Sequence, residues 1–421
     1  MINKLKPKSE FSRNVLTLMT GTTIAQAIPI AISPILTRIY TPEDFGLFAL
    51  FIAITSIFGS IANGRYELAI MLPKKDEDAI NIFALGFIIT SSVSLLLLLL
   101  VMLFHDYFVM LLNNDEIGFW LYFIPIAVFF IGLFNILNYF NTRRKNYKDI
   151  ANATIIKSIV LAIVQLSIGF MKQGASGLIS GQILSQMFAN LRLLKNILKD
   201  KVLISKIKMI ALAKRYKDFP KFSMWAILAN NLSIHFINIL MSIFYSVSTL
   251  GFYSLVQKIL SMPMILIGGS ISQVFFEKAS HEKKIGNNLN DIFIQALKKL
   301  LFISIPLFLI LFFMVEDLFA FVFAEEWRVA GVYAQIVIPL FLSRFIVSAF
   351  TMIPIIYTEL KVDLFFQVGM LLLSFIIIYL SYVGNLDFIT YLMFYSLIIS
   401  VYYLVYLGYL YNRFIKLGEL K

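Results

Sequence analysis

Long apolar runs separated by short polar segments are the dominant pattern along this chain. Two clear runs extend from Ala79 to Phe104 and from Leu364 to Val383. A helix of about 20 apolar residues crosses the hydrocarbon core of a bilayer, where it satisfies its own backbone hydrogen bonds. The pattern predicts twelve membrane-spanning helices, at residues 15–39, 46–71, 79–104, 118–141, 150–171, 175–194, 222–245, 250–275, 292–315, 331–357, 364–383 and 388–411.

The composition supports an all-α integral membrane protein. Hydrophobic residues make up 60% of the 421 residues and charged residues only 14%, whereas soluble domains carry about 25% charged residues. A soluble fold of this size could not cover so much apolar surface. The chain has no cysteine, which excludes disulfides and thiolate metal sites. Its three histidines are far apart in the sequence, so we expect neither a metal site nor a cofactor.

The positions of lysine and arginine indicate the orientation in the membrane. With both termini in the cytoplasm, only Lys172 and Arg328 of the 36 Lys and Arg residues fall in outside loops, and nearly all the others fall in cytoplasmic segments. This asymmetry follows the positive-inside rule. It predicts a multi-pass protein with both termini in the cytoplasm. It also accounts for the net charge of +12 without nucleic-acid binding.

A basic segment divides the chain near its middle, at residues 196–221. Ile204, Ile207, Ile210 and Ala211 recur at helical spacing among its lysines. We interpret the segment as an amphipathic helix on the cytoplasmic leaflet, held by apolar burial and by anionic lipids. A solvated linker is the alternative.

The two halves on either side of this segment resemble each other. The first outside hairpin reads DFGLFAL at residues 44–50, and the first hairpin after the segment reads TLGFYSL at residues 249–255. Both lie between the first and second spans of their half. The match predicts two parallel six-helix repeats, an N-terminal lobe at residues 1–195 and a C-terminal lobe at residues 222–421, joined by residues 196–221.

Charged residues inside the predicted spans are the candidate site residues, because a charge in hydrocarbon is costly and usually faces a cavity or a partner. The predicted spans contain five cations and only one carboxylate. The carboxylate cannot pair with all five, so an anionic ligand or water must compensate the others. Arg344 lies deepest. Snorkelling of the charged head to the interface is the alternative explanation for each cation, and it applies least to Arg344 because of its depth. The five cations are Arg38, Arg65, Lys157, Lys258 and Arg344, and the one acid is Glu67.

Glu67 and His235 are the candidates for ion coupling. Arg65 and Glu67 are two residues apart, so on one helix they should not face each other. Glu67 is therefore expected to contact another helix or the headgroup region. His235 lies in the middle of a span and could titrate near neutral pH, although a lone histidine in a span is more often a hydrogen-bonded packing residue.

The first two spans carry a motif that identifies a family. It reads Gly21-Thr22, Ala25-Gln26, Pro34 and Thr37-Arg38-Ile39-Tyr40-Thr41-Pro42-Glu43-Asp44-Phe45-Gly46, followed by Arg65 and by Glu67-Leu68-Ala69-Ile70. This motif resembles the start of the polysaccharide biosynthesis transporters, the Wzx-type O-antigen flippases of the multidrug/oligosaccharidyl-lipid/polysaccharide exporter superfamily. The rest of the chain agrees with that family in length, in its twelve-span topology and in its half-repeat.

The resemblance implies twelve transmembrane helices in two six-helix lobes around a central cavity that opens to one side at a time. It implies a flippase in the bacterial inner membrane that moves undecaprenyl-pyrophosphate-linked oligosaccharide, an O-antigen or related surface polysaccharide unit, from the cytoplasmic to the outer leaflet. The expected partners are this glycan, membrane lipids and the polysaccharide polymerase machinery. Arg38 and Arg65 match the family motif by position, whereas Lys157, Lys258 and Arg344 are inferred from depth and charge.

Two other functions are compatible with such a chain. A cation-coupled multidrug exporter of the same superfamily should carry acidic residues deep in its lobes, and only Glu67 is available. A membrane glycosyltransferase or polysaccharide polymerase could use Glu43 and Asp44 as a catalytic pair, but a turn after Pro42 that caps the next helix explains these residues better. We therefore expect a transporter and not an enzyme.

Overall fold

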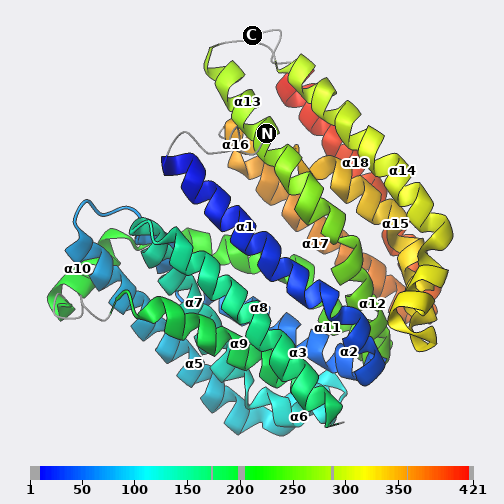
Figure 1. The fold of residues 1–421 in the computed structure, drawn as a ribbon, viewed down its shortest axis with the longest axis horizontal. Helices are drawn as coiled ribbons and strands as arrows, with labels where there is room; N and C mark the ends of the chain where they lie inside the picture. Colours follow the sequence, from blue (N-terminus) through cyan, green and yellow to red (C-terminus); the bar gives the residue numbers. More distant parts are fainter. Residues whose placement is uncertain (1–9, 172–173, 198–203, 286–288, 358, 417–421) are drawn as a thin grey trace, which may run out of the picture. The chain divides into compact units, whose positions relative to one another are not determined.

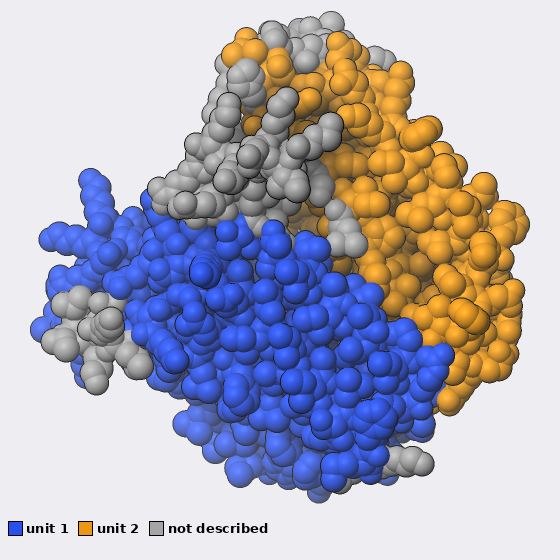
Figure 2. All heavy atoms as spheres, viewed as in Figure 1, with its two compact units in different colours: residues 1–243 blue, residues 244–421 orange. Residues whose placement is uncertain are grey.

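Helices account for nearly all of the described chain, and no strand occurs among the residues that the structure describes. The all-α fold predicted from the sequence is confirmed (Figure 1). The chain forms two compact units, residues 1–243 and residues 244–421 (Figure 2). The structure is a computed structural model and describes residues 10–171, 174–197, 204–285, 289–357 and 359–416.

The described residues of unit 1 form eleven α-helices and one π-helical turn. They are α1 (Glu10–Ala31), α2 (Ser33–Ile39), α3 (Pro42–Ile61), α4 (Tyr66–Ala69), α5 (Asp76–Leu112), α6 (Glu116–Leu121), α7 (Ile124–Arg143), α8 (Tyr147–Phe170), α9 (Ser176–Leu194), α10 (Lys206–Arg215), η3 (Phe219–Ser223) and α11 (Met224–Phe244).

The described residues of unit 2 are helical as well. Its elements are α12 (Val247–Leu260), η4 (Met264–Gly268), α13 (Gly269–Lys284), α14 (Asn290–Phe323), η5 (Glu325–Trp327), α15 (Arg328–Ser348), α16 (Ile353–Ile356), α17 (Leu360–Val383), α18 (Phe388–Leu410) and η6 (Tyr411–Lys416).

Ten helical segments of the described chain are long and apolar enough to cross a membrane. The two remaining predicted spans, 175–194 and 250–275, are helical as well. The first is α9, which buries the polar side chains of Ser185, Gln186 and Asn190 inside unit 1. These polar residues lower the mean hydropathy of the helix, which packs against α7 and α8.

The second of these spans is interrupted near its middle. α12 ends at Leu260, and the π-helical turn η4 follows Pro263 before α13 begins. Proline has no backbone N–H to donate and clashes with the preceding turn, and π-helical turns appear where the regular hydrogen-bond ladder is disturbed. Pro263 therefore marks a break between two helices inside this predicted span.

The predicted span 46–71 is too long. α3 already ends at Ile61, and Gly64 and Arg65 both have positive φ angles, of 58° and 63°. Glycine adopts a positive φ without steric cost, so the Asn63-Gly64 pair ends the helix although apolar residues continue beyond it. Arg65 and Glu67 consequently lie beyond the spanning helix, around the short helix α4.

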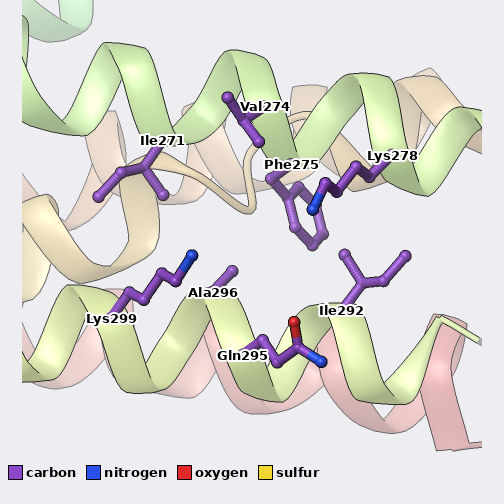
Figure 3. Close-up of a pocket in the computed structure, with 8 residues that line it drawn as sticks. All are labelled: Ile271, Val274, Phe275, Lys278, Ile292, Gln295, Ala296 and Lys299. Atoms are coloured by element: carbon purple, nitrogen blue, oxygen red, sulfur yellow. The ribbon is translucent and has the colours of Figure 1, made fainter.

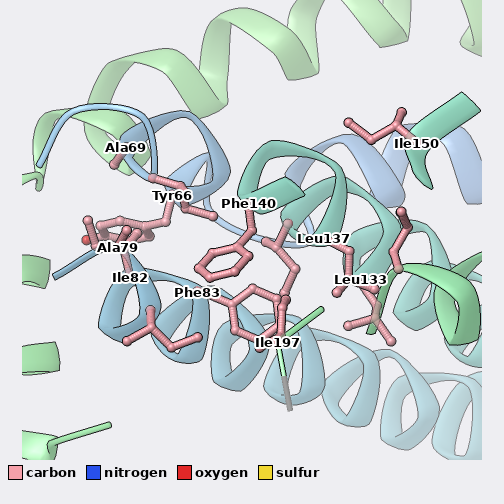
Figure 4. Close-up of a cluster of buried hydrophobic side chains, with 14 of the residues drawn as sticks. Tyr66, Ala69, Ala79, Ile82, Phe83, Leu133, Leu137, Phe140, Ile150 and Ile197 are labelled. Carbon is pink, nitrogen blue, oxygen red and sulfur yellow. The ribbon is translucent and has the colours of Figure 1, made fainter. Parts of the chain in front are cut away.

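A cluster of buried apolar side chains holds α4, α5 and α7 together in unit 1 (Figure 4). The rings of Phe83 on α5 and Phe140 on α7 lie 5.7 Å apart between centroids. Tyr66 from α4 and Leu212 from α10 pack into the same cluster. Close-packed apolar contacts of this kind hold helices together in lipid, where the hydrophobic effect between helices is absent.

Polar side chains of unit 1 connect helices to one another. The Asn63 side-chain amide donates to the Thr90 hydroxyl at 2.8 Å and to the carbonyl oxygen of Gly132 at 2.9 Å. The Asn190 amide donates to the carbonyl oxygen of Phe130 at 2.9 Å. Such hydrogen bonds between membrane helices stabilise them by about 0.6–2 kcal/mol each. The side-chain amides of Asn63 and Asn190 therefore serve helix packing.

Tyr40, directly after α2, packs between two glycines of α8 and α9. Its side chain is almost fully buried, and its hydroxyl donates to the carbonyl oxygen of Gln165 at 2.6 Å. A Cβ atom at Gly169 would lie 2.7 Å from this hydroxyl, and one at Gly177 would overlap it. The close packing of α8 and α9 around Tyr40 therefore requires glycine at both positions.

The basic segment forms a helix that is attached to unit 1. Lys208 on α10 forms an ion pair with Glu77, and the hydroxyl of Tyr66 donates to the carbonyl oxygen of Ala213 at 3.1 Å. Ile207 is 82% exposed, and Ile204, Ile210 and Ala211 are also exposed. A helix thus forms where one was predicted, and its contact with the cytoplasmic leaflet stays a prediction. Lys199 and Lys201 of the predicted segment lie outside the described residues.

The boundary between the two units lies one helix later than the basic segment, because α11 belongs almost entirely to unit 1. The assignment of residues 1–195 and 222–421 to two six-helix repeats concerns topology and stays a prediction.

In unit 2, α15 forms the centre of the packing. It contacts α12, α14 and α18, and its Val337 and Phe345 are fully buried. The ring of Phe308 on α14 lies 6.1 Å from that of Phe345. Arg344 lies on α15 and is therefore placed among the helices of unit 2. We treat it as the central residue of the candidate site.

Candidate functional site

The seven candidate residues divide between the two units. Arg38, Arg65, Glu67, Lys157 and His235 lie in unit 1, and Lys258 and Arg344 lie in unit 2. Within unit 1 the structure brings Arg65 and Glu67 together. Within unit 2 it places Lys258 and Arg344 on α12 and α15, two helices in contact. A single cavity shared by all seven residues stays a prediction.

Arg344 lies on α15 inside the apolar segment Glu325–Ile356, as the sequence predicts. Its side chain is half-buried, and its guanidinium carbon lies 5.5 Å from the ring centroid of Phe341, one turn earlier. No carboxylate among the described residues forms an ion pair with it. A guanidinium in hydrocarbon is costly, so dipoles, water or an anionic ligand must stabilise it.

Two tyrosines from neighbouring helices lie near Arg344. Tyr253 on α12 and Tyr395 on α18 both interact electrostatically with it. Gln257 follows Tyr253 by one turn of α12 and interacts with its hydroxyl. Three helices of unit 2 thus contribute polar side chains near Arg344, and we call Arg344, Tyr253, Gln257 and Tyr395 the Arg344 cluster.

Tyr391 extends the Arg344 cluster by one turn of α18. Its ring lies 5.7 Å from that of Tyr395, and its fully buried hydroxyl has no hydrogen-bond partner among the described residues. A buried hydroxyl usually has a partner. The Arg344 cluster therefore combines a half-buried guanidinium with a neighbouring buried phenol that lacks a hydrogen-bond partner among the described residues.

The prediction from the sequence did not include these tyrosines. Tyr391 and Tyr395 are four residues apart, which puts them on one face of a helix. This spacing is visible in the sequence. Their proximity to Arg344 is not visible there, because it depends on how α12, α15 and α18 pack.

Arg65 and Glu67 form an ion pair, contrary to the expectation from their spacing. The Arg65 guanidinium lies 3.0 Å from a carboxylate oxygen of Glu67, and its Nε donates to the Ser223 hydroxyl at 3.3 Å. The expectation assumed that both residues lie on one helix. Arg65 instead precedes α4 with a left-handed backbone, which turns its side chain back toward Glu67. The pair leaves Glu67 with a counterion and Arg65 less available for a ligand.

Replacement of Arg65 by alanine should destabilise unit 1. Glu67 is 2% exposed, so the substitution leaves a buried carboxylate without its cation. We expect a loss of about 2–3 kcal/mol, below the range for fully buried pairs because Arg65 is partly exposed. Thermal unfolding in detergent measures the loss. The double variant Arg65→Ala/Glu67→Gln should regain stability, and a single variant as stable as the wild type would contradict the role assigned to the pair.

Lys157 lies on α8 and faces an aromatic ring. Its side chain is half-buried, and its amino group lies 5.5 Å from the ring centroid of Phe134 on α7. Among the described residues it has no carboxylate partner. A cation–π contact stabilises an ammonium group only in part, so Lys157 remains a candidate for contact with an anionic ligand.

Arg38, Lys258 and His235 are the remaining candidates. Arg38 is exposed and donates to the carbonyl oxygen of Pro34 at 2.5 Å. Lys258 is half-buried in the last turn of α12. His235 is half-buried on α11 and has no hydrogen bond within the described chain. Their roles as ligand-binding or coupling residues stay predictions.

Glu43 and Asp44, the candidate acidic pair of an enzyme, lie at the start of α3. The Thr41 hydroxyl accepts from the backbone N–H of Asp44 at 3.2 Å, and an Asp44 carboxylate oxygen accepts from the backbone N–H of Thr41 at 2.9 Å. This reciprocal arrangement is a capping box, which satisfies two backbone N–H groups at a helix start. Helix capping therefore accounts for Asp44.

Comparison with known proteins points to one family. A family model described as "Polysaccharide biosynthesis protein" matches residues 35–332, well over half of the chain. No curated protein sequence matches the chain.

Several solved membrane transporters have a similar fold. One is described as lipid II flippase MurJ in an inward closed conformation; it is 16% identical, with 97% of this chain and 89% of that chain covered and a TM-score of 0.74. A mutant of the Vibrio cholerae MATE transporter VcmN is 13% identical, with 95% and 96% covered and a TM-score of 0.57. A further MATE mutant is 12% identical, with 98% of both chains covered and a TM-score of 0.56. At these identities the similarity shows a common fold.

Proposed function

Since this chain belongs to the polysaccharide biosynthesis protein family, we propose that it is a flippase for a lipid-linked oligosaccharide. The proposed substrate is undecaprenyl-pyrophosphate-linked glycan, an O-antigen or related surface polysaccharide unit. Transfer runs from the cytoplasmic to the outer leaflet of the bacterial inner membrane, with both termini in the cytoplasm. The polysaccharide polymerase machinery is the proposed downstream partner.

The Arg344 cluster is the observation that supports this proposal most. A pyrophosphate headgroup with attached sugars cannot cross hydrocarbon unaided, because its charges would lose their hydration. Arginine binds phosphate oxygens bidentately, and no carboxylate of the described chain competes for Arg344. The half-buried Tyr395 can hydrogen-bond sugar hydroxyls and pack its ring against the apolar faces of the sugars. The hydroxyls of Tyr253 and Tyr391, which are buried here, become available to the sugars when alternating access opens the site.

In the proposed mechanism, the polyprenyl tail stays in the bilayer while the headgroup passes through a cationic, hydroxyl-rich interior. Lys157, Lys258 and Arg38 are the proposed secondary contacts for the headgroup. Alternating exposure of the site to the two leaflets completes the transfer. The membrane potential favours outward movement of an anionic headgroup, because the outside is positive.

The decisive test is the leaflet distribution of lipid-linked oligosaccharide in a strain that lacks this protein. We expect the oligosaccharide to accumulate on the cytoplasmic leaflet, because the headgroup cannot cross without a cationic site. Expression of the wild-type protein should restore its appearance on the outer leaflet. An unchanged distribution in the deletion strain would remove the flippase proposal.

A cation-coupled drug exporter is the second candidate function, because the fold is also similar to that of MATE transporters. Such a transporter needs a free carboxylate for a cation or a cationic drug. Glu67 is the candidate from the sequence, and Arg65 already neutralises it. A panel of cationic drugs tests this function: resistance on overexpression would favour the exporter, and no change in resistance is expected for a flippase.

A further inference from the structure

A small pocket lies between α13 and α14 in unit 2. It has a volume of about 240 Å³, which is below the range of about 300–1,000 Å³ that buries a drug-sized ligand. The pocket therefore suits one part of a larger ligand. Its lining includes two lysines, a glutamine and apolar side chains: Lys278, Lys299, Gln295, Ile271, Val274 and Phe275 (Figure 3).

The two lysines come from different helices and point into the same space. Figure 3 shows the amino groups of Lys278, from α13, and Lys299, from α14, both in the gap between the helices. Neither forms an ion pair within the part of the chain that the structure describes. The nearby acids Glu277 and Asp291 do not line the pocket. Two ammonium groups without a counterion favour an anion between them.

An exposed apolar stripe on α14 begins next to this pair of lysines. Phe302 is 82% exposed and lies three residues after Lys299, on the same side of the helix. Ile305 and Leu309 continue the stripe and are also exposed. On α13, Val274 at the edge of the pocket is exposed as well. A ligand with an anionic head at the lysines and a hydrocarbon chain along the stripe would match both surfaces.

The expected position of the pocket in the membrane agrees with such a ligand. The positive-inside rule places the connection between α13 and α14 on the cytoplasmic side. Basic pockets between spanning helices on that side bind anionic lipid headgroups. We propose that Lys278 and Lys299 bind the phosphate of an anionic phospholipid of the inner leaflet, with one acyl chain along Phe302, Ile305 and Leu309. This site is separate from the Arg344 cluster and does not depend on the proposed transport function.

The test measures binding of phosphatidylglycerol to the purified full-length protein by native mass spectrometry. Phosphatidylcholine, which has the same phosphate but no net charge, is the comparison lipid. In the double variant Lys278→Gln/Lys299→Gln we expect phosphatidylglycerol affinity to fall roughly 30-fold, because each lysine near an anionic headgroup contributes about one charge interaction. The single variant Lys299→Gln should show roughly a fivefold loss, and it serves if the double variant does not fold.

The matched control is Lys298→Gln/Lys361→Gln, which removes the same charge at two exposed positions outside the pocket. This control and the charge-preserving Lys278→Arg/Lys299→Arg variant should bind phosphatidylglycerol like the wild type. Millimolar inorganic phosphate should not displace the lipid. Unchanged affinity in the lysine-to-glutamine variants, equal binding of phosphatidylcholine, or displacement by free phosphate would each overturn the proposal.

Discussion

Arg344→Ala should abolish most of the flipping activity while leaving the protein in the membrane. A hydrogen bond to a charged group is worth about 1.5–3 kcal/mol, and 1.4 kcal/mol corresponds to a factor of ten. We therefore expect transport of the lipid-linked oligosaccharide to fall roughly 10- to 100-fold. The measurement is the amount of oligosaccharide on the outer leaflet of the deletion strain that expresses the variant. Membrane insertion should be unaffected, because alanine removes a charge from an apolar span.

Three further variants test whether the loss of transport is specific to the Arg344 guanidinium. Arg344→Lys keeps the charge but cannot bind phosphate bidentately, so it should retain intermediate activity. Tyr395→Phe removes one neighbouring hydroxyl and should have a smaller effect than Arg344→Ala. Arg413→Ala removes an exposed arginine that pairs with Glu359 and should behave like the wild type. Full activity of Arg344→Ala at normal membrane levels would remove the Arg344 cluster from the mechanism.

Gly177→Ala should strongly destabilise unit 1. The new methyl group would overlap the hydroxyl of Tyr40, which is buried and bonded to the carbonyl oxygen of Gln165. Gly169 also lies close to this hydroxyl, so the Tyr40 ring has little room to move aside. Overpacking a tight interior costs about 1–3 kcal/mol, so the midpoint of thermal unfolding in detergent should fall clearly.

A second substitution tests the cause. In Tyr40→Phe/Gly177→Ala the hydroxyl is gone, so part of the lost stability should return, although Tyr40→Phe alone forfeits a hydrogen bond worth about 1 kcal/mol. Gly408→Ala on α18 is the control, because a Cβ atom there meets nothing within 4 Å. It should be neutral or slightly stabilising, since alanine favours helix over glycine. If Gly177→Ala unfolds at the same temperature as Gly408→Ala, the packing of Tyr40 between α8 and α9 is looser than described.

The hydrophobic pattern predicts the helices well and their interruptions poorly. α5 and α14 lie where apolar runs were recognised. The end of α3 was missed because Ala62 and the residues after Leu68 are apolar, so hydropathy continues across the turn. The dipeptide Asn63-Gly64 marks that turn. The positive φ angle of Gly64 ends the helix although the residues around the turn are apolar.

For the candidate site, the sequence identifies charges but not their partners. Depth and charge alone single out Arg344, and the structure places it among polar side chains of unit 2. The partner of Glu67 was predicted incorrectly, because a side chain at a helix start points differently from one inside a helix. The ring of Phe134 beside Lys157 could not be predicted, since the short connection makes α7 and α8 neighbours but does not determine which of their faces meet.

The great length of α14 has a consequence for the choice of lipid. With 34 residues this helix measures about 51 Å, whereas the hydrocarbon core is about 30 Å thick. A helix with surplus length adapts to a thicker or thinner bilayer by tilting or by shifting along its axis. We therefore expect α14 to adapt to acyl chains of different lengths at a small cost in free energy.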